Sequence, residues 1–145
     1  MKATSLCFVL LCCIVQVLSA EFPEELIDDI VRECLKEHNV DIKELSKYFD
    51  DKLRITSVDD VGNKLIKCSI EKRKYYAPDG GFDKDVVLKD IAKSLTAFVK
   101  TEGTDYEALA EKLYEKCEGI KGADQVEHIV NWNNCLVDEL VKMNN

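Results

Sequence analysis

The sequence predicts an all-α domain, a compact bundle of about six helices braced by two disulfides. Three observations indicate this fold class. Apolar residues recur at helical spacing along most of the chain. No alternating apolar and polar run is long enough to form a strand. The two prolines and six glycines separate the helical segments instead of accumulating in linkers.

The first twenty residues have the pattern of a signal peptide. Lys2 supplies a positive start, residues 6–18 are apolar except for Gln16, and Ser19 and Ala20 are the small residues of a cleavage site. A membrane anchor is the competing interpretation, but a span needs roughly 20 apolar residues, more than this run contains. We therefore expect residues 1–20 to be a signal peptide and residues 21–145 to be one domain in the extracellular fluid.

Helical periodicity divides the mature chain into six segments. The first three begin at Pro23, Asp41 and Ser57, because proline suits a first turn and aspartate can cap a helix. Asn39 is the expected end of the first helix. The apolar positions of these segments are Leu26, Ile27, Ile30, Val31, Cys34 and Leu35, then Ile42, Leu45, Tyr48 and Phe49, then Val58, Val61, Leu65 and Cys68.

The last three helices follow the strongest break in the chain, the turn residues 77–81. The fourth helix stops near Gly103. Thr104 followed by Glu107 predicts a capping box for the fifth helix, and the glycines at 119 and 122 reverse the chain before the sixth. The apolar positions are Val87, Leu88, Ile91, Ala92, Leu95 and Phe98, then Leu109, Leu113 and Cys117, then Val126, Ile129, Val130, Leu136, Val137 and Leu140.

Four cysteines remain after the signal peptide is set aside: Cys34, Cys68, Cys117 and Cys135. An even number in an exported chain predicts two disulfides. Four cysteines allow three pairings, and their positions alone leave the choice open. The reversal at 119–122 makes a bridge between Cys117 and Cys135 feasible, since a single straight helix, rising about 1.5 Å per residue, would hold them too far apart.

Charge and motifs exclude several functions. The formal net charge of −8 argues against binding nucleic acid, which requires a basic surface. The two histidines, His38 and His128, form no His-x-x-x-His pair, and no nucleophile elbow or phosphate-binding glycine loop occurs. We therefore expect no enzyme activity, no cofactor and no metal site.

The signal peptide, the six helices and the cysteine spacing together resemble the insect odorant-binding protein family, of the pheromone and general odorant-binding type. In its six-cysteine members, three residues separate the second cysteine from the third, and eight separate the fifth from the sixth. The four cysteines here match the first, third, fourth and sixth of that pattern, with Lys64 and Val126 at the second and fifth positions. The two absent cysteines pair with each other in the family, so the chain resembles the four-cysteine, minus-C branch.

The resemblance implies a pairing, a cavity and a ligand. The family pairing is Cys34–Cys68 and Cys117–Cys135, and the family's helices surround an internal apolar cavity that carries odorants, pheromones or other lipophiles. Minus-C relatives include body-fluid and accessory-gland carriers, so an olfactory role does not follow. We expect ligand contact from the inward faces of the third to sixth helices, with these candidates: Leu65, Val87, Ile91, Leu95, Leu113, Ile129 and Trp132.

Two functions therefore compete. The preferred one is a secreted carrier whose partner is a small hydrophobic ligand, with a membrane receptor involved only indirectly and the protein a monomer or weak homodimer. The alternative is a secreted helical interaction protein, such as a salivary, venom or immune factor, whose solid core leaves only its surface to act. Displacement of a fluorescent apolar probe separates the two.

Overall fold

A computed structural model describes residues 21–144, and the predicted signal peptide lies outside these residues. The described chain holds two short 3-10 helices (η), five α-helices and no β-strand, so the all-α prediction is confirmed. In chain order the elements are η1 (Glu24–Leu26), α2 (Asp29–Glu37), η2 (Ile42–Tyr48), α3 (Asp60–Arg73), α4 (Lys84–Phe98), α5 (Tyr106–Cys117) and α6 (Gln125–Asn144). Within this stretch no helix is both long and apolar enough to cross a membrane.

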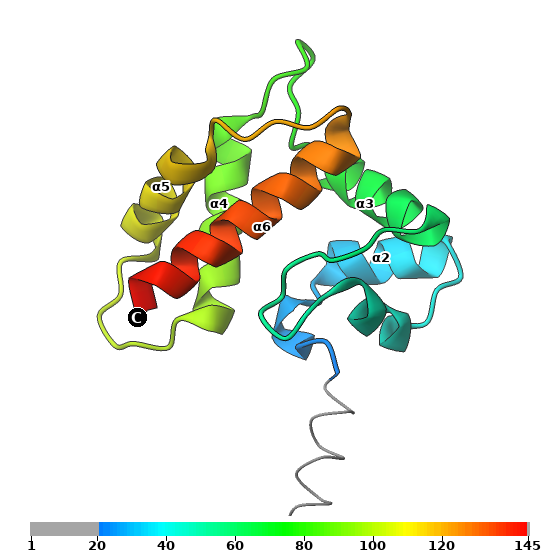
Figure 1. The fold of residues 1–145 in the computed structure, drawn as a ribbon, viewed down its shortest axis with the longest axis horizontal. Coiled ribbons are helices and arrows are strands. Elements are labelled where there is room, and N and C mark those ends of the chain that lie inside the picture. The colour runs from blue at the N-terminus through cyan, green and yellow to red at the C-terminus, as the bar shows by residue number, and fades with distance from the viewer. Residues whose placement is uncertain (1–20, 145) are drawn as a thin grey trace, which may run out of the picture.

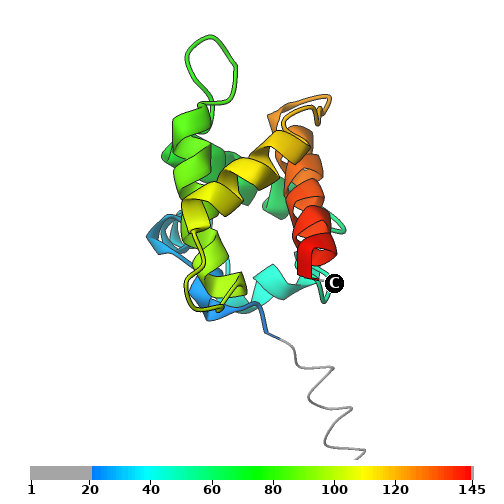
Figure 2. The ribbon, with the colours of Figure 1, turned by 90° about the vertical axis from the view of Figure 1, so that its left-hand side faces the viewer.

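The elements form two packed groups (Figure 1). The N-terminal half contains η1, α2, η2 and α3, and the C-terminal half contains α4, α5 and α6. In the C-terminal half, α5 lies across α4 and α6 (Figure 2). Each half has its own cluster of buried apolar side chains, and the end of α3 joins the C-terminal cluster through Ile70.

Both predicted disulfides are present, with one in each half. Cys34–Cys68 joins α2 to α3, and Cys117–Cys135 joins the end of α5 to α6. The Cα atoms are 5.9 Å apart in each pair. The second bridge depends on the predicted chain reversal, in which Gly122 lies so close to α6 that a Cβ there would collide with the backbone nitrogen of His128.

The prediction of one continuous first helix was wrong. The chain breaks between η1 and α2, because the Asp28 side chain accepts a hydrogen bond from the backbone N–H of Val31 at 3.0 Å and begins a new helix there. The second predicted segment is the 3-10 helix η2, capped by Asp41 as expected. Asn39 adopts the left-handed conformation, with φ of 51°, just after α2 ends.

Aspartate caps also move two predicted helix starts. Asp59 accepts from the N–H of Gly62, so α3 begins at Asp60 and not at Ser57. Asp105 caps α5 in place of the predicted capping box, while the Thr104 hydroxyl donates to a carbonyl three residues earlier. A short carboxylate reaches the free N–H groups of a first turn and is favoured by the helix dipole.

Ionic and polar contacts join the two halves. Neither of the two disulfides between described residues crosses from one half to the other. The side chain of Asn134 in α6 bonds both the N–H and the carbonyl of Ile55, at 2.7 and 2.9 Å. Arg54 lies 3.3 Å from Asp138. At the positions of the family's missing bridge, Lys64 is exposed and Val126 is buried; the minus-C assignment stays a prediction.

Candidate ligand cavity

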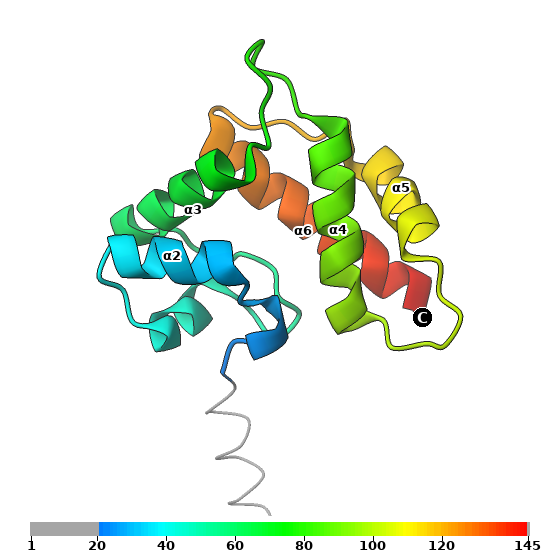
Figure 3. The same cartoon turned by 180° about the vertical axis from the view of Figure 1, so that it is seen from behind.

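A cavity of about 420 Å³ lies where the two halves meet. Small-molecule sites usually have volumes of roughly 300–1,000 Å³. The N-terminal half supplies Phe22, Leu26, Phe49 and Leu53 with the end of α3, and the C-terminal half supplies α4 and α6. Figure 3 shows the side on which α4 crosses in front of α6. The cavity is therefore built by segments far apart in the sequence.

The longest apolar wall belongs to α6. It consists of four half-buried aliphatic side chains, Leu136, Val137, Leu140 and Val141. In the solid part of the C-terminal core, by contrast, Val87 and Leu113 are 0% and 1% exposed. The second half of α6 thus presents aliphatic groups that the protein's own side chains cover only in part.

One end of the cavity is polar and centres on Arg73. Its Nη1 lies 2.7 Å from Asp90 Oδ1 and 2.9 Å from Asp28 Oδ2, and its Nη2 donates to Asp28 Oδ1 at 3.0 Å. Its Nε donates to Ser69 Oγ at 3.0 Å. The Tyr75 hydroxyl donates to the other oxygen of Asp90. This network ties α3, α4 and the cap of α2 together.

The network holds its members in defined protonation states. Burial raises the pKa of Tyr75 well above its ordinary value, and the Asp90 carboxylate adds to the shift. Burial also acts to raise the pKa of Asp28, but hydrogen bonds from Arg73 and from the N–H of Val31 outweigh it, so the pKa is lowered. For Arg73, burial opposes the charge, but its anionic neighbours prevail and the pKa is raised. At neutral pH, Asp28 and Arg73 are charged and Tyr75 is not.

A smaller cavity of about 160 Å³ lies within the N-terminal half. Four residues line both cavities: Phe22, Leu26, Phe49 and Ser69. The ring centroids of Phe22 and Phe49 are 4.7 Å apart. This aromatic pair is therefore part of the partition between the two cavities.

Three of the seven predicted contact residues meet at the larger cavity: Ile91, Leu95 and Trp132. The first two come from α4 and the third from α6. Leu65 lines the smaller cavity instead. Ligand contact stays a prediction for each of them.

The other three predicted contact residues line neither of the two cavities. Val87 and Leu113 lie in the solid core of the C-terminal half, and Ile129 packs against that core. Val87 and Ile129 share a helix face with Ile91 and Trp132, which line the larger cavity, whereas no residue of α5 lines either cavity. Helical period identifies the inward face, but it does not say whether another side chain or empty space lies opposite.

Sequence reasoning missed the contribution of the non-helical segments. Phe22, Phe49 and Leu53 line the larger cavity, and none of them lies in a regular helix. No helical pattern covers Phe22 or Leu53, and the periodicity that places Phe49 in the second helix overruns the helix, which ends at Tyr48. The only available signal was the presence of apolar residues in segments that are otherwise polar.

An aromatic cluster lies behind the Trp132 wall. The Tyr76 hydroxyl is 2.6 Å from His128 Nδ1, and the Phe82 ring stacks on His128 at 4.5 Å and meets Trp132 edge-on at 5.3 Å. Burial raises the pKa of Tyr76 to about 12. Burial and the charge of Lys121 lower the pKa of His128. Tyr76 and Phe82 flank the 77–81 turn, so the His128 side chain, neutral at pH 7, joins this turn to α6.

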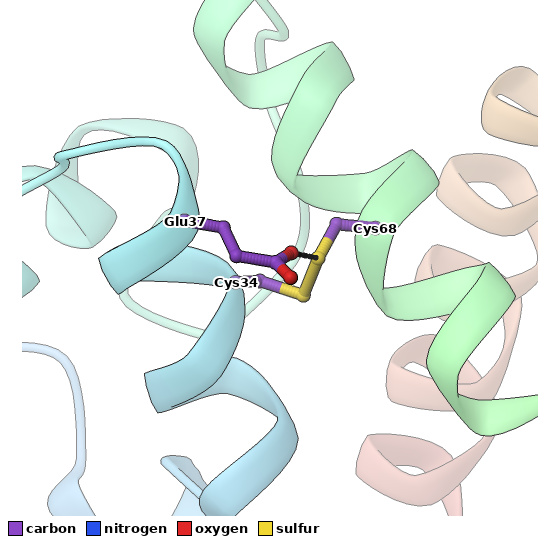
Figure 4. A group of neighbouring side chains, drawn as sticks. All are labelled: Cys34, Glu37 and Cys68. Carbon is purple, nitrogen blue, oxygen red and sulfur yellow. Dashed lines mark hydrogen bonds between the residues drawn. A yellow bond between two sulfur atoms is a disulfide. The ribbon is translucent and has the colours of Figure 1, made fainter.

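A grouping of Cys34, Cys68 and Glu37 has the residue types of a metal site. Figure 4 shows Glu37 Oε2 beside Cys68 Sγ, at 3.2 Å. Both sulfurs are used in the disulfide, which has neither a proton to donate nor a thiolate to coordinate a metal. Lys72 Nζ lies 3.2 Å from the other Glu37 oxygen. The carboxylate thus has a cationic partner already.

A disulfide-braced helical fold around a partly apolar cavity is the architecture expected of a small-molecule carrier. Comparison with protein families agrees: the model of the PBP/GOBP family matches residues 19–139. The chain therefore belongs to the PBP/GOBP family, the odorant-binding proteins of insects. Members are small soluble carriers of odorants and pheromones, not enzymes. Neither the curated proteins nor the solved structures contain a match to this chain.

Proposed function

We propose that residues 1–20 are a signal peptide and that residues 21–145 form a secreted carrier. The carrier binds a small hydrophobic ligand, such as an odorant, a pheromone or another lipophile, in the cavity between its halves. We infer a monomer or weak homodimer that meets a membrane receptor only indirectly. The family membership supports the class of function, and the cavity supports the place of binding.

One observation carries this proposal. Four aliphatic side chains on one face of α6 remain half-buried because they face the 420 Å³ cavity: Leu136, Val137, Leu140 and Val141. Covering apolar surface contributes about 25 cal/mol per Å², so a lipophile seated there gains free energy without any rearrangement of the core. A protein that acts only through its surface has no need of such a cavity, so the cavity favours the carrier over the interaction protein.

Displacement of a fluorescent naphthylamine probe from the delipidated mature protein tests the proposal. Saturable binding and displacement by aliphatic ligands are expected. Val137→Trp fills the cavity and should weaken probe binding about tenfold, the loss that roughly 1.4 kcal/mol represents. Val130→Trp is the matched control, because Val130 lies two turns earlier on α6 and lines neither cavity. Equal effects of the two substitutions, or no saturable binding, would favour the interaction protein.

Trp132 provides an independent readout, because it is the only tryptophan in the chain and lines the larger cavity. Its side chain is buried, and its Nε1 has no hydrogen-bond partner among the described residues. A bound lipophile should shift or quench its emission saturably, with the same midpoint as probe displacement. An unchanged spectrum alongside proven binding would place the ligand elsewhere.

A further inference from the structure

The larger cavity is asymmetric in polarity. Ser69 and Arg73 of α3, Tyr75, and Asp90 and Ser94 of α4 give one wall hydrogen-bonding groups, whereas α6 supplies mostly aliphatic ones on the other side. The remaining polar lining residues are Lys52, Asn133 and Asn144, of which Lys52 and Asn144 are exposed. A chain-like ligand along α6 would have its apolar body covered and its head group beside the α3–α4 wall.

That wall offers no unpaired positive charge. Its cation, Arg73, is half-buried, and each of its three nitrogens already has a partner in Asp28, Asp90 or Ser69. Asp90 balances Arg73 at this wall, and Asp28, which lines the outer pocket and not the cavity, is a second carboxylate partner of Arg73. A ligand carboxylate would lie beside the like charge of Asp90 and would find Arg73 already neutralised, so it would lose hydration without gaining an ion pair.

A hydroxyl head group finds suitable partners at the same wall. A carboxylate has about four acceptor positions, and within residues 21–144 Asp90 accepts from Arg73 and Tyr75 alone, so it can accept a hydrogen bond from a further donor. The Ser94 hydroxyl makes no hydrogen bond within residues 21–144, although it lines the cavity. It can donate to the oxygen of an alcohol whose own proton goes to Asp90.

The lysines near this wall face outward. Arg73, Tyr75 and Asp90 also line a separate surface pocket of about 300 Å³, together with Lys72, Lys89 and Lys93. None of these three lysines lines the larger cavity. The ion-pair network thus separates a cationic outer pocket from the interior, and these lysines offer no ion pair to a head group inside the cavity.

We propose that the cavity selects lipophiles with a neutral hydroxyl head group over carboxylates of equal chain length, through Asp90 and Ser94. This inference rests on the proposed carrier function. The discrimination comes from the fixed network of Arg73, Asp28 and Asp90, and the apolar part of the cavity contributes equally to both ligands.

Competition against the naphthylamine probe at pH 7 tests the inference with 1-dodecanol, dodecanoate and dodecane. The alcohol should compete at least about tenfold better than the carboxylate, the ratio given by one buried hydrogen bond or one unfavourable charge contact. Asp90→Asn should reduce that preference severalfold. Asp138→Asn should not, since Asp138 pairs with Arg54 outside the cavity. Ser94→Ala should weaken binding of the alcohol and leave binding of the alkane unchanged.

The outcomes separate this inference from the carrier function. If none of the three compounds displaces the probe, the carrier proposal fails, and the inference fails with it. If the wild-type protein binds dodecanoate as tightly as the alcohol, the carrier stands and the inference is overturned. An unchanged preference in folded Asp90→Asn overturns it too. Should that variant fail to fold, the wild-type ligand series and Ser94→Ala decide the matter.

Discussion

The two halves of the protein cover their apolar residues differently. In the C-terminal half, three long helices bury Val87, Leu113 and Cys117 to 1% exposure or less. The N-terminal half has only two α-helices, joined to two short 3-10 helices and a loop, and it encloses a cavity of about 160 Å³. The larger cavity lies at the junction, where neither half provides enough side chains to fill the space. The contrast shows that the larger cavity is a consequence of incomplete packing between two separately braced units.

Truncating one leucine of the solid core and one leucine of the cavity wall tests this contrast, and the core variant should show the largest effect of all those predicted here. Leu113→Ala should lower the free energy of unfolding by about 3 kcal/mol, within the ~2–5 kcal/mol range of core truncations. Leu136→Ala should cost about 1 kcal/mol, because its side chain is half-buried beside an existing cavity. Urea denaturation measures both values, and equal losses would contradict the division into solid core and cavity wall.

A covalent tie between the halves would sharpen the comparison. If Lys64 and Val126 occupy the positions of a lost cysteine pair, Lys64→Cys with Val126→Cys should form a third disulfide, which requires Cα atoms within about 7 Å. The bridge should stabilise the protein by roughly 2–4 kcal/mol and narrow the range of ligand sizes accepted. Two free thiols after mild oxidation would refute the minus-C alignment. Either single variant controls for the loss of the native side chain.

Removing the partition between the two cavities should change the ligand chain length that binds best more than it changes the free energy of unfolding. Phe22→Ala removes one ring of the Phe22–Phe49 pair and should connect the small cavity to the larger one. In a homologous series of alcohols, the optimum should move to a longer chain, with a gain of up to about tenfold for the longest members, equivalent to one or two additional buried methylenes. Phe98→Ala is the matched control, since Phe98 lines only the larger cavity. The same optimum in both variants would contradict the partition.

The smallest expected effect concerns pH and His128. Because burial and Lys121 lower the pKa of His128 below its ordinary value of 6.5, the unfolded chain binds a proton more readily than the folded one. The free energy of unfolding should therefore fall as pH drops below about 6.5, the ordinary value for histidine. His128→Gln removes this titration and should show a flatter dependence. Thermal unfolding at pH 7 and at lower pH compares the two proteins, and parallel curves would contradict the assignment.

Local chemistry explains why so much of the fold was predictable. Four cysteines, helical periodicity and the turn residues 77–81 and 119–122 indicated the fold class, and the family resemblance supplied the disulfide pairing. The first residues of the helices were harder to predict, because Ser57, Thr104 and the nearby aspartates all have side chains that can cap a helix. In the structure, Asp59 and Asp105 are the caps of α3 and α5. Which of several adjacent side chains caps a helix depends on the path of the chain that enters it.

The cavity was decided by tertiary structure alone. Leu113 and Leu136 are both apolar residues at helical spacing, yet one is fully buried and the other faces the cavity. Likewise, Phe22 belongs to no periodic pattern and Phe49 lies just beyond the end of η2, but the two rings meet between the two cavities. A sequence determines which face of a helix turns inward, because apolar side chains avoid water. Whether that face meets another side chain or an unfilled space depends on how far apart the two halves are held, and that distance is set by contacts such as Arg73 with Asp90 and Asn134 with Ile55.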